Sequence, residues 1–265
     1  MVSEPEKGQL LHRAVRILDC FTREHPDLGV REVARKVGLS SSAAGRLMAT
    51  MKDLGMLSQN SKTRIYSLGP RALTWAGTYL STSDIRNVAL PYLQDLHQKT
   101  QETISLYILD GHERVCIERL ESTQNVRFVA PRVGRHLPLH AGSAGKVLLA
   151  YLPDGLREEI LSSSLEKLTE KTIVDLEELR EELVEIRKKG YALSDGEWIL
   201  DASGIAAPVF DRGGSISAAI TISGPTQRFT RQAIEVYIEC ILQVATSISH
   251  DLGFIGDIHS ERFYT

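Results

Sequence analysis

The sequence predicts a two-domain α+β protein, with a small helical domain that ends in a hairpin and a larger domain in which helices flank an antiparallel sheet. Apolar residues recur at helical spacing in the first third of the chain, whereas residues 103–120 contain two alternating strands and residues 204–225 contain two more strands. Strands joined by short hairpins and flanked by helices are typical of an α+β arrangement. A length of 265 residues suits two domains.

Three short helices are predicted within residues 1–55. The second places Val33, Ala34 and Val37 inward and breaks at Gly38. The third begins after a tight turn, where Ser40 or Ser41 can cap its N-terminus, and Gly55 ends it. The residues expected to face inward from the first and third helices are Leu10, Leu11, Ala14, Ile17, Leu18, Phe21, Leu47, Met51 and Leu54.

A hairpin follows the third helix, with a polar turn over 59–63 and a second strand over 65–68. Three helices and a hairpin form a winged helix-turn-helix, whose helix after the tight turn enters the major groove of DNA. Serine hydroxyls there can bond phosphates or base edges, and an arginine can pair with guanine or clamp a phosphate. The residues expected to meet DNA are Ser41, Ser42, Ala43, Gly45 and Arg46 on the helix, with Lys62 and Arg64 on the wing.

The charge distribution favours a nucleic-acid partner for the front of the chain. Residues 1–82 contain 12 Lys and Arg against 7 Asp and Glu, a net charge of +5, and the remainder carries −8. A basic front on an acidic body is expected when only the front touches a polyanion. Serines at a helix start, taken singly, are more often caps than DNA contacts, so the prediction depends on the whole helix–turn–helix–hairpin order.

Several classes of protein are disfavoured by what the sequence lacks. The N-terminus has no apolar signal-peptide core, and no run of about 18 apolar residues could span a membrane. The three cysteines, Cys20, Cys116 and Cys240, are scattered and odd in number, and no cysteine or histidine pair has zinc spacing. We therefore expect a cytoplasmic protein with no disulfide framework, no membrane partner, no metal site and no cofactor.

The rest of the chain begins with a helix initiated by Pro70, whose apolar side would come from Leu73, Trp75 and Tyr79. A second helix should run from Asp84, as its N-cap, to Thr100. The expected boundaries are therefore 1–69 for the winged helix, 70–83 for a linker helix and 84–265 for the larger domain.

In the larger domain, two strands over 103–120 should be joined at Asp110-Gly111, a dipeptide typical of a type I′ hairpin turn. A third strand is expected over 125–131, and two more within 204–225, joined by a glycine turn. Helices are expected at about 142–152, 155–162, 175–189 and 230–252.

The stretch "PLHAGSAGKVLLAY", residues 138–151, has the look of a phosphate-binding loop. However, Gly142 and Gly145 are three residues apart instead of five, and Val147 stands where a Mg²⁺-binding hydroxyl belongs, so a nucleotide site is disfavoured. Ser143, Ala144 and Gly145 begin a helix whose first N–H groups and dipole favour a small anion, and a carboxylate fits better than a triphosphate.

Alternatives remain open around this loop. A helix N-terminus packed on the sheet, with nothing bound, is the simplest one. Leu137 and Leu139 could instead pack the body of a small organic acid. His140 is expected to be structural, and Lys146 to point to solvent or to brace the loop.

Motifs along nearly the whole chain resemble the IclR family of bacterial transcriptional regulators. In the first domain these are Arg46-Leu47, the T-x-x-x-x-G stretch from Thr50 to Gly55 and the Y-x-L-G ending of the wing from Tyr66. In the larger domain, residues 134–150 and 190–225 are similar to the effector-loop motifs of the family. The resemblance implies a GAF-like effector-binding domain, a linker helix that helps to form a homodimer, and often a dimer of dimers.

The resemblance also implies ligand contacts at Leu137, Ser143, Ala144, Ser194, Gly204, Thr221 and Ser223. Thr221 and Ser223 alternate with isoleucines, so both hydroxyls should face one side of their strand. Family members often have Lys-Ser-Thr in place of Ser41-Ser42-Ala43. Members with an acidic residue and a cysteine in place of Ser194 and Gly204 suit a very small ligand.

Ser194 and Gly204, where such members have the acidic residue and the cysteine, suggest a larger or more acidic effector for this chain. Asp195 and Glu197 could partly replace the missing charge, and Trp198 could cover the pocket. Cys240 lies on an apolar helix and is most simply a small buried hydrophobe.

The predicted function is a ligand-responsive, DNA-binding transcriptional regulator, more often a repressor of a catabolic operon than an activator. Its partners would be double-stranded operator DNA with two half-sites and a small organic acid. The alternative is a hydrolase or transferase acting on a small carboxylate, with His140, Ser143 and Asp195 as a catalytic set, but the sequence has no G-x-S-x-G elbow and we expect no catalytic residue. A scaffold whose second domain only dimerises is a third possibility.

Overall fold

The computed structural model describes residues 4–22, 24–124 and 132–256, so the strand expected over 125–131 lies outside the described residues. The chain divides into two compact units, residues 1–82 and 83–265. The helix that follows the wing is thereby grouped with the first unit.

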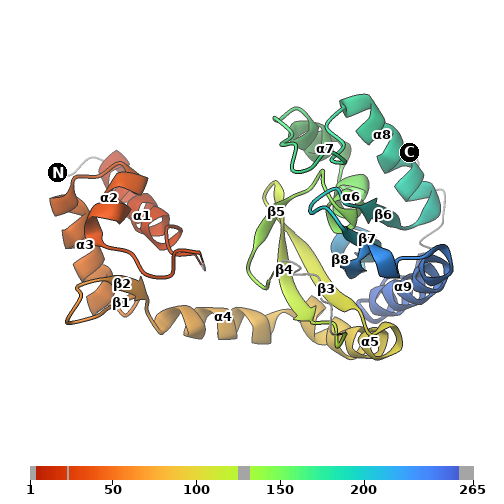
Figure 1. Cartoon of the computed structure of the whole chain (residues 1–265), viewed down its shortest axis with the longest axis horizontal. Coiled ribbons are helices and arrows are strands. Elements are labelled where there is room, and N and C mark those ends of the chain that lie inside the picture. Colours follow the sequence, from red (N-terminus) through yellow and green to blue (C-terminus); the bar gives the residue numbers. More distant parts are fainter. Residues whose placement is uncertain (1–3, 23, 125–131, 257–265) are drawn as a thin grey trace. The chain divides into compact units, whose positions relative to one another are not determined.

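The first unit is a winged helix-turn-helix (Figure 1). Its helices are α1 (Glu4–Leu18), α2 (Val30–Val37) and α3 (Ser41–Asp53), and its hairpin consists of β1 (Leu57–Gln59) and β2 (Tyr66–Leu68). The hairpin is antiparallel, and Leu28 pairs with Tyr66 on its other side. Gly38 has the left-handed conformation that ends α2, as the sequence predicts. The last helix of the unit is α4 (Arg71–Thr82).

The core of the first unit differs in part from the prediction. Val33, Ala34 and Val37 are buried as expected, as are Ile17, Phe21 and Met51. Leu10 and Leu11 are 58% and 69% exposed, because α1 meets the core further along, at Ala14, Ile17 and Leu18. Leu54 is 48% exposed because it lies beyond the last turn of α3. The buried stripe of α3 is instead Ala44, Met48 and Met51.

No residue of α4 is buried. Leu73, Trp75 and Tyr79, the residues predicted to supply its apolar side, are all exposed in the single chain. The guanidinium of Arg71 lies 5.7 Å from the centre of the Trp75 ring, and its Nη1 donates to the Leu54 carbonyl at 2.7 Å. These contacts tie the start of α4 to the end of α3.

The second unit is a six-stranded antiparallel sheet with helices on both faces (Figure 1). Its strand order is β5-β4-β3-β8-β7-β6. The strands are β3 (Thr103–Asp110), β4 (Glu113–Leu120), β5 (His136–Pro138), β6 (Ala192–Asp195), β7 (Ala202–Phe210) and β8 (Ile216–Pro225). The helices are α5 (Asp84–Thr100), α6 (Ser143–Tyr151), α7 (Asp154–Leu161), α8 (Leu176–Lys189) and α9 (Arg231–Asp251), with the short 3₁₀ turn η1 (Thr226–Arg228) before α9.

The two faces of this sheet carry separate cores. Helices α5 and α9 pack on one face, where Ile205, Ala207 and Val209 of β7 meet them. Helix α6 packs on the other, where Ala206 and Phe210 of the same strand point, and α8 packs against α6. The alternation of β7 therefore serves two cores, which is why this strand reads as a nearly continuous apolar run.

Three local expectations for the second unit need correction. Only Gly111 has a positive φ in the β3–β4 turn, whereas a type I′ turn requires one at both central residues. Ser83, and not Asp84, is the N-cap of α5. Strands β5 and β6 were not predicted, because three or four residues are too few to show a clear alternation.

Candidate functional site

The exposed surface of α3 presents small polar side chains and one arginine. Ser40 caps the helix, since its hydroxyl accepts from the Ala43 N–H at 3.2 Å. Ser41, Ser42 and Arg46 are exposed, and the Arg46 Nη1 donates to the Ser42 hydroxyl at 2.7 Å. The guanidinium is thus held over the first turn of the helix, where recognition helices meet base edges.

Two of the predicted DNA contacts lie differently. Ala43 and Gly45 are half-buried, and a Cβ on Gly45 would lie 3.5 Å from Val30 of α2, so Gly45 faces the neighbouring helix. Ala49 and Thr50 are exposed one turn beyond Arg46 and two turns beyond Ser42, on the same side of α3. Helical spacing from Arg46 could have pointed to both of them.

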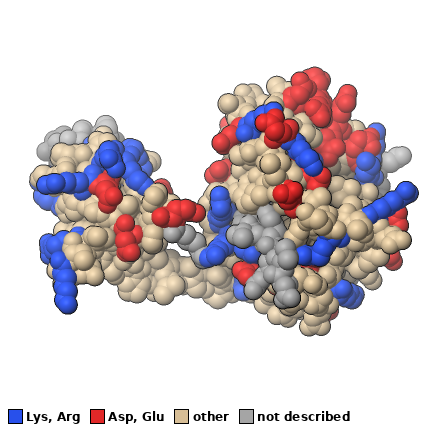
Figure 2. Space-filling view, in the orientation of Figure 1, with Lys and Arg blue, Asp and Glu red and all other residues tan. Residues whose placement is uncertain are grey.

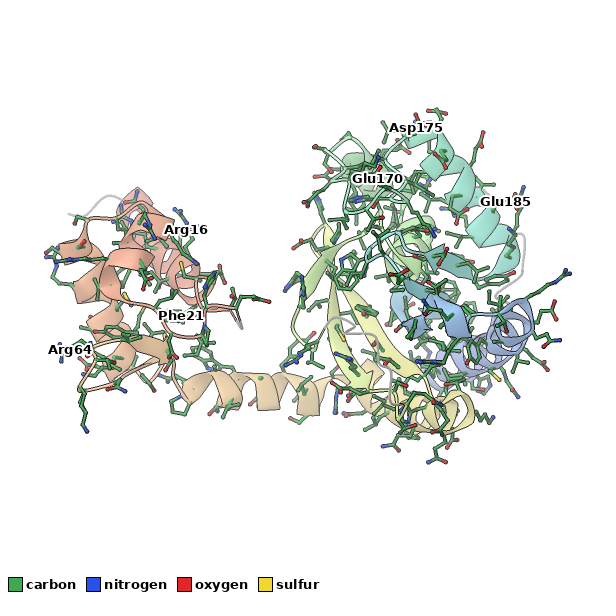
Figure 3. All side chains as sticks on the ribbon, viewed as in Figure 1. Arg16, Phe21, Arg64, Glu170, Asp175 and Glu185 are labelled. Atoms are coloured by element: carbon green, nitrogen blue, oxygen red, sulfur yellow. The ribbon has the colours of Figure 1, made fainter. Side chains whose placement is uncertain are left out.

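The wing carries its predicted basic residues at the turn between β1 and β2. Asn60 shapes this turn, because its side-chain oxygen accepts from the N–H groups of Lys62 and Thr63 at 2.9 and 3.2 Å. Lys62 and Arg64 are both exposed, and Arg64 lies at the hairpin end of the unit (Figure 3). Figure 2 shows basic side chains over the surface of this unit, while acidic side chains of the second unit gather over α8.

A cavity opens in the second unit at the N-terminus of α6. It encloses about 470 Å³ of space that no protein atom fills, part of it open to solvent. Six of the eight predicted effector contacts line it, namely Ser143, Ala144, Ser194, Gly204, Thr221 and Ser223. The other described lining residues are Tyr107, Arg114, Gly142, Trp198, Ile199, Ala202 and Ser203.

Strand register explains why residues far apart in sequence meet here. Gly204 of β7 pairs with Ser194 of β6 on one side and with Ser223 of β8 on the other. A Cβ on Gly204 would lie 3.0 Å from the Ser143 hydroxyl, so the glycine keeps space open between the sheet and α6. Hydroxyls from two strands and one helix therefore face a common cavity.

Leu137 and Asp195, the other two predicted contacts, are not among the described lining residues. Leu137 and Leu139 are buried in the core beneath α6. The Asp195 carboxylate accepts from Lys171 at 2.6 Å and from Ser203 and Thr226 at 2.8 Å. Hydrogen bonding to Lys171, chiefly, lowers the pKa of Asp195. Asp195 is therefore engaged outside the cavity and does not replace the charge missing at Ser194.

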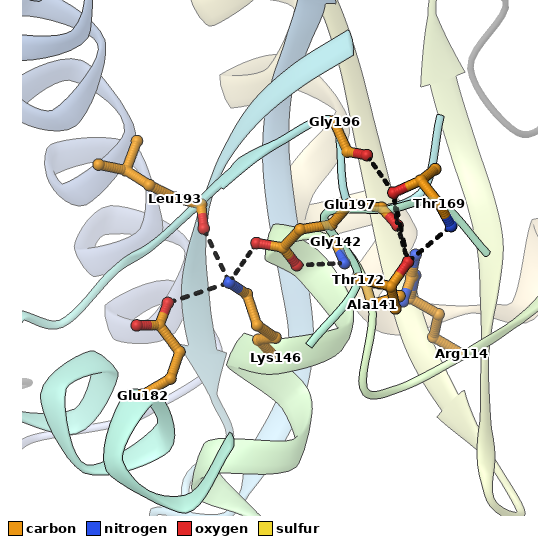
Figure 4. A network of polar contacts seen from close by, with 10 residues as sticks. All are labelled: Arg114, Ala141, Gly142, Lys146, Thr169, Thr172, Glu182, Leu193, Gly196 and Glu197. Carbon is orange, nitrogen blue, oxygen red and sulfur yellow. Dashed lines mark hydrogen bonds and ion pairs between the residues drawn. The ribbon is translucent and has the colours of Figure 1, made fainter. Parts of the chain in front are cut away.

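Lys146 is buried and braces the loop; the expectation that it points to solvent is wrong. It is 1% exposed, and its Nζ donates to Glu197 Oε1 at 2.6 Å and to Glu182 Oε1 and the Leu193 carbonyl at 3.0 Å (Figure 4). The other Glu197 oxygen accepts from the Gly142 N–H at 3.0 Å. Glu197 thus bridges Lys146 and the N-cap of α6, and it too is unavailable as a substitute charge for the cavity.

Residues 196 and 197, which follow Asp195, are also held through their backbone carbonyls. The Thr169 hydroxyl donates to the Gly196 carbonyl, and the Thr172 hydroxyl donates to the Glu197 carbonyl, both at 2.6 Å (Figure 4). Trp198 follows directly and lines the cavity, as the sequence suggested, with the Arg135 guanidinium 5.5 Å from the centre of its ring. The wall of the cavity beside Trp198 is therefore anchored by groups behind it.

The catalytic set imagined from the sequence is not assembled. His140 is buried, and its Nε2 bonds the Glu166 carbonyl at 2.9 Å, while Asp195 is held by Lys171. No group of three His, Cys, Asp or Glu residues that could hold a metal ion occurs in the described part of the chain. Among the same residues, no helix is both long and apolar enough to cross a membrane.

Arg114 and Tyr107 line the cavity and were missed by the sequence reading. Arg114, at the start of β4, is 4% exposed, and its guanidinium lies 5.6 Å from the centre of the Tyr107 ring. Burial lowers the pKa of Arg114 to about 10, and burial raises the pKa of Tyr107 above its ordinary value. Alternation along β4 places Arg114 on the same face as the buried Cys116, a signal that could have revealed it.

A winged helix-turn-helix followed by a cavity-bearing α+β domain defines a two-domain transcriptional regulator. The family model of the bacterial transcriptional regulator IclR C-terminal domain matches residues 77–250, and that of the IclR helix-turn-helix domain matches residues 10–61. The chain therefore belongs to the IclR family of DNA-binding transcriptional regulators, in which the C-terminal domain binds small-molecule effectors.

Similar proteins agree with this assignment. The chain is 29% identical to the transcriptional repressor IclR of Escherichia coli K12, over 96% of this chain and 94% of that protein. It is 33% identical to the transcriptional repressor AllR of Klebsiella pneumoniae, over 94% and 92%. An IclR homologue from Microbacterium hydrocarbonoxydans, solved in complex with 4-hydroxybenzoate, is 32% identical with a TM-score of 0.80, over 92% and 98%. These relatives are regulators and not enzymes, so the hydrolase or transferase alternative is rejected.

Proposed function

We propose that this regulator is a repressor of a catabolic operon that binds its operator through α3 and the wing, and that a small organic acid bound in the α6 cavity controls it. The observation that carries the proposal is the cavity itself, where the N-terminus of α6 meets hydroxyl groups from β6 and β8. Backbone N–H groups at a helix N-terminus favour anions, and convergent hydroxyls supply orientation. Two of the similar proteins are repressors, and a third was solved with an aromatic carboxylate.

The DNA contacts of the proposal are Ser41, Ser42 and Arg46 on α3. Lys62 and Arg64 on the wing would contact the phosphate backbone. Because these residues belong to the basic front of the chain, operator binding should weaken steeply with salt. A regulator with this role acts in the cytoplasm, where bacterial DNA lies.

The effector can act only by favouring one arrangement of the DNA-binding heads over another. We propose a homodimer, or a dimer of dimers, in which α4 transmits this bias. The exposed apolar side chains Leu73, Trp75 and Tyr79 support this role, since a second copy could cover them. A dimer would present two recognition helices to two half-sites.

The test combines operator binding with effector response. The full chain should retard DNA from its own promoter region at low salt, and a carboxylate effector should release it. Arg46→Ala should weaken binding by about 1–3 kcal/mol if it reads a base, or lower the salt slope by about 1 if it contacts a phosphate.

Arg231→Ala is the matched control, because Arg231 is an exposed arginine of the second unit. Its operator affinity should equal that of the unchanged protein. Absence of DNA retardation at low salt, or an Arg46→Ala variant that binds as tightly as the control, would contradict the proposed DNA contacts. A DNA complex that no small carboxylate changes would contradict the proposed effector class.

A further inference from the structure

Arg114 is a buried guanidinium without a carboxylate partner among the described residues. Its side chain is 4% exposed, and no acidic oxygen of those residues lies within ion-pair distance. Nη1 donates to the carbonyls of Ala141, at 2.8 Å, and Pro138. Within the described part of the chain, Nε has no hydrogen-bond partner. Burial of a charge without an opposite charge is costly, so this arrangement calls for an anion.

The guanidinium lies directly against the N-terminus of α6. Nη1 and Nη2 are 2.1 and 3.3 Å from the positions that a Cβ would take on Gly145 and Gly142. These two glycines therefore make the room that Arg114 fills. The positive end of the α6 dipole and the positively charged guanidinium therefore lie next to each other. They repel each other unless an anion binds between them.

The nearest carboxylate, Glu197, does not fill that role. One of its oxygens accepts from the Gly142 N–H and the other from Lys146. It raises the pKa of Arg114 only through space, and burial outweighs it. Among the described residues that line the cavity, Arg114 is the one that carries a charge, so the cavity offers a single positive centre.

We propose that Arg114 is the anchor for the effector's carboxylate, which it binds through Nη2 together with the first N–H groups of α6. This inference rests on the proposed function and narrows it. One guanidinium and one helix end form a single positive centre, so the proposed effector carries one negative charge, as a monocarboxylate does. The hydroxyls of Ser194, Thr221 and Ser223 would then bind hydroxyl or oxo groups on the body of that acid.

The test uses the full chain and pairs of probes that differ only in charge. Pyruvate, glycerate and 4-hydroxybenzoate are each compared with the corresponding carboxamide, by thermal shift and calorimetry. At least one acid should bind, and its amide should bind at least tenfold more weakly. Arg114→Gln should lower the affinity for that acid at least tenfold, and Arg114→Lys should restore part of it, because a lysine keeps the charge without the fork of donors.

Arg231→Gln, which removes the same charge from an exposed site, should bind the acid as the unchanged protein does. If Arg114→Gln binds the acid normally, or if the amide binds as well as the acid, the anchor is overturned, while the first of these results leaves an organic-acid regulator intact. If no carboxylate binds the unchanged protein or alters its DNA complex, the proposed effector class fails, and the anchor fails with it.

Since Arg114→Gln could disturb folding, a second measurement uses the unchanged protein. A crystal structure with the tightest-binding acid should place a carboxylate oxygen about 3 Å from Arg114 Nη2, a hydrogen-bond distance. A carboxylate directed at Thr221 and Ser223, with Arg114 left unpaired, would overturn the proposal regardless of how the variants behave.

Discussion

Helices α3 and α6 begin with similar sequences and use them in opposite ways. Both start with serine, alanine and glycine, over 41–45 and over 143–145. The start of α3 is exposed and capped by the Ser40 hydroxyl. The start of α6 has Gly142 as its N-cap, with no side-chain cap, and every residue of the helix is buried. One helix offers side chains to a partner, and the other offers backbone N–H groups to a cavity.

The difference teaches that small residues at a helix start have no fixed role; the groups around them decide it. Around α6 those groups are charged and buried, namely Lys146, Glu197 and Arg114. Around α3 they are exposed, and the Arg46 side chain donates to the Ser42 hydroxyl. Substitutions should therefore cost more stability at α6 than at α3. Three experiments test this, given from the largest expected effect on stability to the smallest.

The largest effect is expected from Lys146→Met. It removes the cation that Glu197 contacts at 2.6 Å and leaves a buried carboxylate with only the Gly142 N–H. Loss of one partner from a buried ion pair costs about 3–5 kcal/mol, which denaturant unfolding followed by near-UV circular dichroism should report. Lys167→Met, in an exposed ion pair, should cost less than about 1 kcal/mol. Equal costs for the two variants would show that the buried pair does not hold the loop.

Two matched glycine-to-alanine substitutions should change the stability of the protein in opposite directions. A Cβ on Gly145 would lie 2.4 Å from the Leu139 carbonyl oxygen, so Gly145→Ala forces the backbone apart and should cost about 1–3 kcal/mol. A Cβ on Gly45 would make an ordinary contact with Val30, so Gly45→Ala should stabilise α3 by up to about 1 kcal/mol. Thermal unfolding of both variants tests this, and a gain in stability for Gly145→Ala would contradict the close packing at α6.

The smallest effect should come from Ser40→Ala. The hydroxyl caps α3 by accepting from the Ala43 N–H, and loss of such a cap costs about 1 kcal/mol. Amide hydrogen exchange would localise the loss to the first turn of α3. Ser42→Ala, beside it but outside the cap, is the control and should leave that exchange unchanged; faster exchange in both variants would mean that the cap is not specific to Ser40.

The helices and strands with long sequence patterns were predicted well. The nine-residue β7 is a long apolar run and the ten-residue β8 contains a clear alternation, so both were found. Helix α8 has both an Asp175 cap and a terminal Gly190, so its bounds follow from the sequence. The winged helix followed from the order of its elements. The errors at Leu10, Leu11 and Leu54 arise because spacing defines a stripe but not how far along the helix the partner surface extends.

The candidate cavity was less predictable. Ser143, Thr221 and their neighbours came from motif resemblance and strand alternation, and they do line it. Arg114 was missed because an arginine in a strand is usually exposed, and only its contact with the glycines of α6 reveals why it can be buried. The role of Lys146 stayed open because its partners Glu182 and Glu197 lie 36 and 51 residues away in the chain.

The brace formed by Lys146 and Glu197 also bears on how this regulator could be redesigned. In the described structure, Lys146 donates to Glu182 and the Leu193 carbonyl and Glu197 accepts from the Gly142 N–H, whereas the side chains of Ser194, Thr221 and Ser223 take no part in the brace. The frame of the cavity and its lining are thus separate sets of residues at these positions. A library that varies the three hydroxyl positions can change the lining of the cavity to fit other small molecules, while the scaffold that holds α6 in place stays intact.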